Sequence, residues 1–213
     1  MNHVERFRAV MDFQPVDRLP RWEWAIWWDE TIADWRRQGL PEGLESVFDI
    51  AEDMSYNKGP MISEGHFDEF IAPYYRQIVP RLLEKNVIPL VDTDGDVTMM
   101  APWLLREGIR GVLPLERQAG VDGMDLRRAF PRLNMVGHFD KMVMNGGERG
   151  MRAEFERLLP LMRSGGFIPS VDHQTPPHVT LDEYRLYRRL LNEYTAFGTA
   201  GTGNVDPNVF IHR

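Results

Sequence analysis

Short apolar runs alternate along the chain with longer segments in which apolar residues recur at helical spacing. The apolar runs have the length of strands buried on both faces and cover residues 20–28, 47–54, 87–92, 111–116, 133–140 and 167–173. Helices are predicted over the first dozen residues and at about 29–38, 63–85, 97–107, 122–129, 147–163 and 180–194. Strands that alternate with helices in this way predict an α/β fold with a parallel sheet.

Capping and breaking residues mark the ends of several predicted helices. Thr180 is followed three residues later by Glu183, which is the pattern of a capping box. Gly108 and Gly165 follow two of the helices, as residues that end helices often do. Pro15 ends the first helix and leads into an extended connection.

The alternation is compatible with a closed barrel or with an open doubly wound sheet. Neither GxGxxG nor GxxxxGK[ST] occurs, which disfavours the nucleotide-binding open sheets. We therefore expect a TIM-type (β/α) barrel in one domain over residues 1–213. The barrel is expected to be shortened, because only six good strands are visible where a closed barrel of this type needs about eight.

Missing strands have consequences for the tail and for assembly. We expect residues 198–213 to form a flexible or gap-filling tail, in which 209–211 could supply a seventh strand. An incomplete barrel leaves strand edges and apolar helix faces uncovered. The sequence therefore predicts a homodimer or a segment-swapped oligomer.

Composition narrows the classes of function and of partner. The net charge of −7 comes without a basic stripe, which argues against a nucleic-acid surface. The absence of cysteine excludes thiolate chemistry, so any metal must be held by oxygen or nitrogen ligands. No apolar stretch approaches the length of about 18 residues of a membrane span, and the N-terminus is a charged helix start, so we expect a cytoplasmic protein.

Acidic and histidine residues follow five of the six apolar runs. In a parallel barrel the strand ends meet at one mouth, where active sites form. The residues at these ends are Glu52 and Asp53, Asp92 and Asp94, Glu116, His138 and Asp140, and Asp172 and His173. Because so many runs end in this way, the pattern favours a site at the mouth.

Each of these positions also has a structural explanation. Asp92 and Asp94 could form a turn that caps the helix beginning near residue 97. Asp172 and His173 could cap a proline-rich loop, and Glu116 could pair with a neighbouring arginine. His138 and Asp140 could form an ion pair with Lys141 in their loop.

The run over residues 20–28 offers one further charged candidate. Glu23 lies between Trp22 and Trp24, so strand alternation sends it to the face opposite the two indoles, as suits a charge inside the mouth. The tryptophans could stack on a flat ligand, although aromatic core packing is the better interpretation.

Several segments carry motifs that recur in one order in a known family. They lie at residues 6–10, 15–20, 52–63, 70–75, 90–96, 111–116 and 167–173. In these segments the chain resembles the uroporphyrinogen decarboxylase superfamily, which includes corrinoid-dependent methyltransferases. The resemblance covers nearly all of residues 3–194. The motifs at 52–63 and 90–96 are similar to those of a methyltransferase-like branch.

Two departures limit what the resemblance implies. Full members carry a longer stretch before the motif that begins at Glu52, so about two βα units are missing here. The decarboxylase branch has an arginine-containing signature for the substrate's carboxylates, and nothing in this chain matches it. Decarboxylation of a porphyrinogen is therefore not expected.

The resemblance also implies a metal site. The zinc-dependent methyltransferases have a His-x-Cys-Gly motif where this chain has Asp-Thr-Asp-Gly at 92–95, and their later cysteine falls near residues 172–173. Carboxylate and imidazole ligands suit Mg²⁺ or Mn²⁺, and they also accept Zn²⁺. A corrinoid partner is implied by the resemblance alone. The implied metal ligands are Asp92, Asp94, Asp172 and His173.

We therefore expect a methyltransferase-like enzyme that acts on a small molecule, with a divalent metal as Lewis acid. The candidate catalytic residues are Glu52, Asp53, Glu116 and His138. The candidate substrate-binding residues are Glu23, Lys58 and Asp140. The alternative is a non-catalytic or degenerate barrel homologue that binds a small ligand or metal, or that serves structurally as an oligomer.

Overall fold

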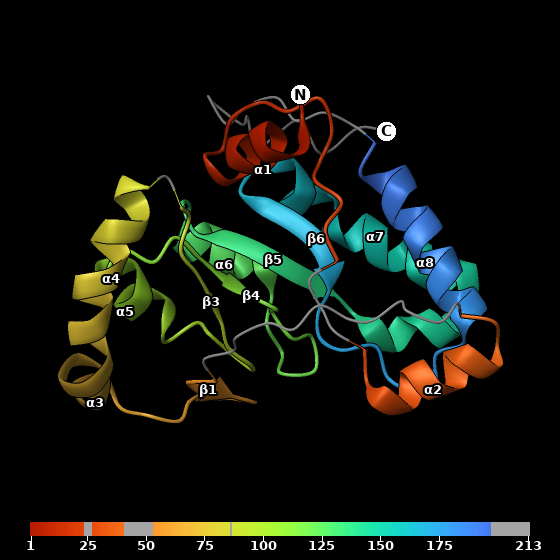
Figure 1. Cartoon of the computed structure of the whole chain (residues 1–213), viewed down its shortest axis with the longest axis horizontal. Helices are drawn as coiled ribbons and strands as arrows, with labels where there is room; N and C mark the ends of the chain where they lie inside the picture. The colour runs from red at the N-terminus through yellow and green to blue at the C-terminus, as the bar shows by residue number, and fades with distance from the viewer. Residues whose placement is uncertain (24–26, 41–52, 86, 197–213) are drawn as a thin grey trace.

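A four-stranded parallel sheet forms the centre of the molecule (Figure 1). The structure is a computed structural model and describes residues 1–23, 27–40, 53–85 and 87–196. The strand order is β3–β4–β5–β6, which is also the order along the chain. The strands are β3 (Leu90–Asp92), β4 (Gly111–Leu113), β5 (Asn134–Phe139) and β6 (Phe167–Val171). Each lies inside a predicted run, so the predicted α/β class with parallel strands is confirmed for this part of the chain.

Burial explains why these strands read as continuous apolar runs. Every residue of β4, β5 and β6 is buried, as expected for strands that have packed neighbours on both faces. Val112, Val136 and Ile168 are fully buried and belong to one core with the helices.

The helices lie in the predicted segments, but the segment at 63–85 is divided and the helix predicted at about 97–107 begins only at Ala101. They are α1 (His3–Met11), α2 (Asp29–Arg37), α3 (Glu64–His66), α4 (Ala72–Glu84), α5 (Ala101–Arg106), α6 (Gly123–Ala129), α7 (Gly147–Arg163) and α8 (Leu181–Tyr194). A π-helical turn at Phe67–Ile71 joins α3 to α4, and a 3-10 helix at Lys141–Gly146 precedes α7. Thr180 and Glu183 form the predicted capping box of α8.

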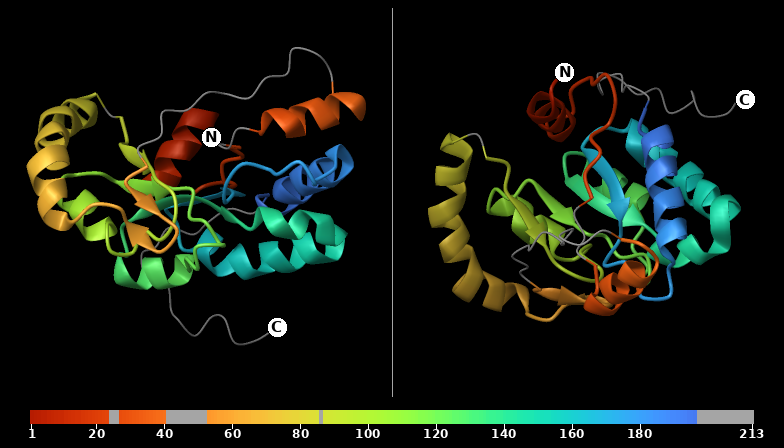
Figure 2. Two further views of the ribbon diagram at one scale, coloured as in Figure 1. Left: turned by 90° about the horizontal axis from the view of Figure 1, so that it is seen from below. Right: turned by 45° about the vertical axis from the view of Figure 1, so that its right-hand side comes forward.

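The helices are distributed around the sheet. α7 packs against β5, β6 and α8, and α1 contacts β6. α4 and α5 lie on the side of β3, and α4 runs along the outer flank of the molecule (Figures 1 and 2).

The described residues do not close a barrel. β3 ends the sheet on one side, and on the other side Trp27 forms an isolated parallel bridge with Thr175 beyond β6. Four parallel strands with their helices are consistent with part of a barrel. This bridge is all that the structure assigns to the predicted strand at 20–28, of which 24–26 lie outside the described residues. Residues 47–52 of the second predicted strand and the tail at 198–213 lie outside them too.

An antiparallel hairpin was not predicted from the sequence. It consists of β1 (Ser55–Tyr56) and β2 (Gly59–Pro60), joined by a turn in which Asn57 has a φ of 45°. Asparagine tolerates this conformation better than most residues, and Asn-x-Gly was the available signal. The hairpin lies beside the loop that follows β3, where it affects the site described below.

No helix among the described residues has the length and apolar character that a membrane span requires.

Candidate functional site

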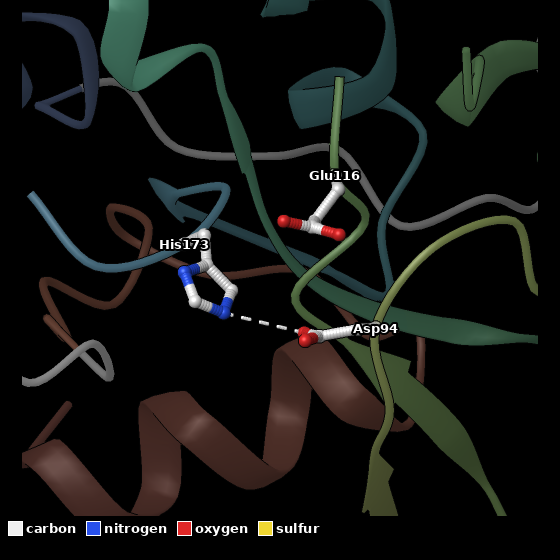
Figure 3. Close-up of side chains that lie close together, drawn as sticks. All are labelled: Asp94, Glu116 and His173. Atoms are coloured by element: carbon white, nitrogen blue, oxygen red, sulfur yellow. Dashed lines mark ion pairs between the residues drawn. The ribbon is translucent and has the colours of Figure 1, made fainter. Parts of the chain in front are cut away.

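Three candidate side chains converge beyond the carboxyl ends of the parallel strands. Asp94 follows β3, Glu116 follows β4 and His173 follows β6, and one ligand atom of each lies within 4.8 Å of the other two (Figure 3). Parallel strands end at the same edge of a sheet, so residues far apart in sequence meet there. This group is the observation that supports the predicted site at the strand ends.

An ion pair and a backbone hydrogen bond organise the group. The Nε2 atom of His173 lies 3.3 Å from Oδ1 of Asp94, and their side chains are 27% and 24% exposed. The backbone N–H of Gly95 donates to Oε2 of Glu116 over 3.1 Å. A ligand can therefore reach the three side chains from solvent while their positions are held by the surrounding loops.

Electrostatics favours the charged form of the histidine. Burial alone lowers the pKa of His173, but the hydrogen bond and the charge of Asp94, together with the charge of Glu116, outweigh it. The net effect is a raised pKa for His173. A bound cation would take the place of this proton, because a histidine ligates a metal only in its neutral form.

The donor set fits a small divalent ion. Two ligands of a tetrahedral ion with bonds of about 2.1 Å lie about 3.4 Å apart, close to the 3.3 Å between His173 and Asp94. Two carboxylates and an imidazole suit Zn²⁺, Mn²⁺ or Mg²⁺ by their chemistry. Glu116, predicted as a catalytic residue, joins this group of ligand atoms.

The hairpin holds the loop that carries Asp94. The N–H of Ser55 donates to the Thr93 hydroxyl over 2.9 Å, and the N–H of Asp96 donates to the Asn57 carbonyl over 2.9 Å. Gly95 has a φ of +75°, and a Cβ atom there would lie 2.4 Å from the Asn57 nitrogen. Only glycine permits this close approach, so the hairpin and the site are structurally linked.

The other two predicted metal ligands are not in the group. Asp172 is fully buried and accepts hydrogen bonds from the backbone N–H groups of Arg117 and Lys141 over 2.9 and 3.1 Å. The Lys141 ammonium is 3.3 Å from the same carboxylate. Burial raises the pKa of Asp172, although Lys141 and both N–H groups oppose this. Asp172 thus ties two mouth loops together, while Asp92 ends β3 and is half-buried.

His138 is buried in a network of structural hydrogen bonds. Its Nε2 atom accepts the Gly123 N–H over 2.9 Å, so Nδ1 carries the proton and donates to the Leu115 carbonyl over 2.9 Å. Burial, aided by the charge of Arg157, lowers the pKa of His138 to about 3. The imidazole is therefore neutral, and its hydrogen bonds explain its presence without a catalytic role. The catalytic role of His138 stays a prediction.

The remaining candidates lie in separate places. Asp140 caps the 3-10 helix by accepting the Met142 N–H, and it also accepts from the Gln118 amide, both over 2.8 Å. The ion pair of His138 or Asp140 with Lys141 is not observed in the described part of the chain, because Lys141 pairs with Asp172. Asp53 and Lys58 are exposed, the latter in the hairpin turn, and Glu52 lies outside the described residues.

Glu23 belongs to a second polar cluster, with residues that sequence reasoning missed. It accepts hydrogen bonds from the hydroxyls of Ser170 in β6 and Tyr184 in α8, and Arg188 lies 3.7 Å away. Burial raises the pKa of Glu23, against the effects of Ser170 and Arg188. The only sequence signal for Tyr184 and Arg188 was that they share one face of the predicted helix, a pattern that core packing explains equally well.

Trp27 and Trp35 follow the packing interpretation, whereas Trp22 and Trp28 are 38% and 44% exposed. Trp27 and Trp35 have ring centroids 5.2 Å apart at 63°, and both lie against Tyr184. Trp35 is fully buried, so it belongs to the core.

Residues 46–194 match the family model described as Uroporphyrinogen decarboxylase (URO-D). The match includes the hairpin, all four strands of the sheet, and Asp94, Glu116 and His173. No curated protein matches the chain.

Proposed function

Because the chain belongs to the uroporphyrinogen decarboxylase family, we propose that it is a methyltransferase-like enzyme which acts on a small molecule at a divalent-cation site. The proposed cation ligands are Asp94, Glu116 and His173. The observation that carries the proposal is the convergence of these three side chains from three separate strand ends.

The chemistry of the site follows from its ligands and their exposure. A bound divalent cation would supply a Lewis acid that stabilises an anionic oxygen or sulfur of the substrate. The Gly95 N–H orients the Glu116 carboxylate, and the loop after β3 orients Asp94. Glu23, in its separate buried cluster, is proposed to bind a polar group of the substrate.

The branch of the family is argued from what the chain contains. The sequence resembles methyltransferase-like members in its motifs and lacks the arginine signature of porphyrinogen decarboxylation. The net charge of −7 and the acidic strand ends repel a substrate that carries many carboxylates. A small thiol or hydroxyl acceptor therefore suits this cation site better than a polycarboxylate does.

Metal binding is the first test of the proposal. Isothermal titration of metal-free protein with Zn²⁺, Mn²⁺ and Mg²⁺ should show one site for at least one of the ions. Asp94→Asn, Glu116→Gln and His173→Ala should each weaken that binding by at least about tenfold. Asp125→Asn, which changes an exposed carboxylate on α6, is the matched control and should bind as the wild type does. Absence of a site, or equal affinity in all variants, would contradict the proposed centre.

A transfer assay separates an enzyme from the alternative, a non-catalytic homologue. The metal-loaded protein is incubated with methylcobalamin and a set of small thiols, and loss of the cobalt–carbon bond is followed by absorbance. Turnover that depends on Asp94, Glu116 and His173 supports the enzyme. Tight metal binding without turnover for any thiol favours the non-catalytic alternative.

A further inference from the structure

A cavity of about 410 Å³ lies at the opposite end of the sheet from the candidate cation site. It is lined by residues that precede or begin the strands, among them Arg110, Arg132 and Asn134, and by Arg8 of α1. Gly111 and Asn134 are register partners at the starts of β4 and β5, which places the cavity at the amino ends of the strands.

The charge of this cavity is opposite to that of the chain as a whole. Arg8, Arg110 and Arg132 come from three segments, and no described carboxylate lies within ion-pair distance of them. Asp12 is the one acidic residue among the described lining residues. The Arg132 guanidinium lies 4.5 Å from the centroid of the Phe13 ring, a contact that restrains it beside the cavity. Three guanidinium groups without a protein anion are a binding environment for an oxyanion.

A buried amide provides a second, independent indication of a ligand. Asn134 is 3% exposed, and its Oδ1 atom has no hydrogen-bond partner within the described part of the chain. A buried acceptor without a partner is costly, and such groups in folded proteins usually have one. The backbone N–H of Asn134 donates to the Arg110 carbonyl over 2.9 Å, so the unpartnered group belongs to the side chain. The lining therefore offers cationic donors together with one neutral acceptor.

We propose that this cavity binds a phosphate group that carries a proton, either free phosphate or a small phosphate monoester. The guanidinium groups of Arg8, Arg110 and Arg132 donate to the anionic oxygens. The Asn134 Oδ1 atom accepts the P–OH proton. A tetrahedral anion with no hydroxyl, such as sulfate at neutral pH, satisfies the arginines and leaves Asn134 without a donor. The site is independent of the proposed cation centre, because no residue is shared between them.

Titration calorimetry at pH 6.5 and constant ionic strength tests the site, with inorganic phosphate, glycerol 3-phosphate and sulfate as probes. We expect phosphate to bind more tightly than sulfate. Arg110→Gln and Arg132→Gln should each weaken phosphate binding by about tenfold or more. Arg185→Gln is the matched control, because it removes an exposed arginine of α8 that does not line the cavity, and this variant should bind phosphate with unchanged affinity. Thermal melting of each variant shows whether it is folded.

Asn134→Leu tests the role of the acceptor. Leucine has a similar volume and suits a buried strand, so this variant should fold, and it should bind phosphate and sulfate with equal affinity. Comparison of the two phosphate compounds identifies the ligand. Tighter binding of glycerol 3-phosphate points to a small organic phosphate, and tighter binding of inorganic phosphate points to the free anion. Absence of phosphate binding, wild-type affinity in the arginine variants, or equal affinity of the wild type for sulfate would each overturn the proposal.

Discussion

At the scale of single residues, His138 shows how burial determines the chemistry of a side chain. It is fully buried, adopts a φ of 69°, and uses both ring nitrogens in hydrogen bonds to the protein. Protonation of Nε2 would replace an acceptor by a donor that faces the Gly123 N–H and the Arg157 guanidinium. The neutral form of His138 is therefore part of the folded structure.

This arrangement predicts that His138 contributes a loss of stability in mild acid. The unfolded chain binds a proton at His138 near pH 6.5, whereas the folded chain does so only at about pH 3. Between these values the unfolded state holds more protons at His138, so the contribution of this residue to the free energy of unfolding falls as the pH is lowered, by up to about 1.4 kcal/mol per pH unit. Urea denaturation of the wild type and of His138→Gln between pH 4.5 and 7.5 measures this contribution. The variant should be less stable at pH 7.5 and lose less stability below pH 6.5, and parallel curves would contradict the prediction.

At the scale of elements, the β1–β2 hairpin positions the loop after β3. Backbone hydrogen bonds join the two segments, and Gly95 permits their close approach. Asp94 precedes this glycine, and Glu116 accepts its N–H. The proposed cation site therefore depends on an element that contributes none of its ligands.

Gly95→Ala tests this dependence. The new Cβ would lie 2.4 Å from backbone, so the hairpin or the loop must move. We expect a loss of about 1–3 kcal/mol in the free energy of unfolding and cation affinity reduced by about tenfold. Gly120→Ala is the control, since Gly120 has a comparable φ of +87° and nothing within 4 Å of its added Cβ. Chemical denaturation should show a loss of stability in both variants, because both place alanine at a positive φ. Metal titration should show reduced cation affinity in Gly95→Ala alone. Unchanged cation affinity in Gly95→Ala would contradict the link.

At the scale of the whole molecule, one helix face within the described residues is apolar and exposed. Phe70, Tyr74 and Ile78 follow one another at four-residue intervals from the π-helical turn into α4, and they are 55%, 69% and 52% exposed. An antiparallel second copy, centred on Tyr74, would pair Phe70 with Ile78, so the apolar pattern suits self-association.

We predict a homodimer through this face. Light scattering should give about twice the mass of the 24.8 kDa chain. Tyr74→Glu should yield a monomer, because it places two like charges at the centre of the pairing. Val4→Glu changes an equally exposed apolar residue on α1 and should leave the mass unchanged. A wild-type monomer at micromolar concentration would show that the stripe does not mediate dimerisation.

Much of the fold was predictable from the sequence because its signals are local. Apolar runs of strand length became β3, β4, β5 and β6, and the capping box at Thr180 began α8 where expected. Whether the sheet closes into a barrel is not decided by these local signals, since closure depends on contacts between segments far apart in the chain.

The sequence by itself determined the strand–helix order, the family and the presence of carboxylates and histidines at the strand ends. Only the tertiary structure decided which of them meet. Asp94, Glu116 and His173 converge, while Asp172, adjacent to His173 in the chain, is buried against Lys141. The physical reason is that the direction of a side chain in a loop depends on its packing partners, and for Asp94 these lie in a hairpin some forty residues earlier.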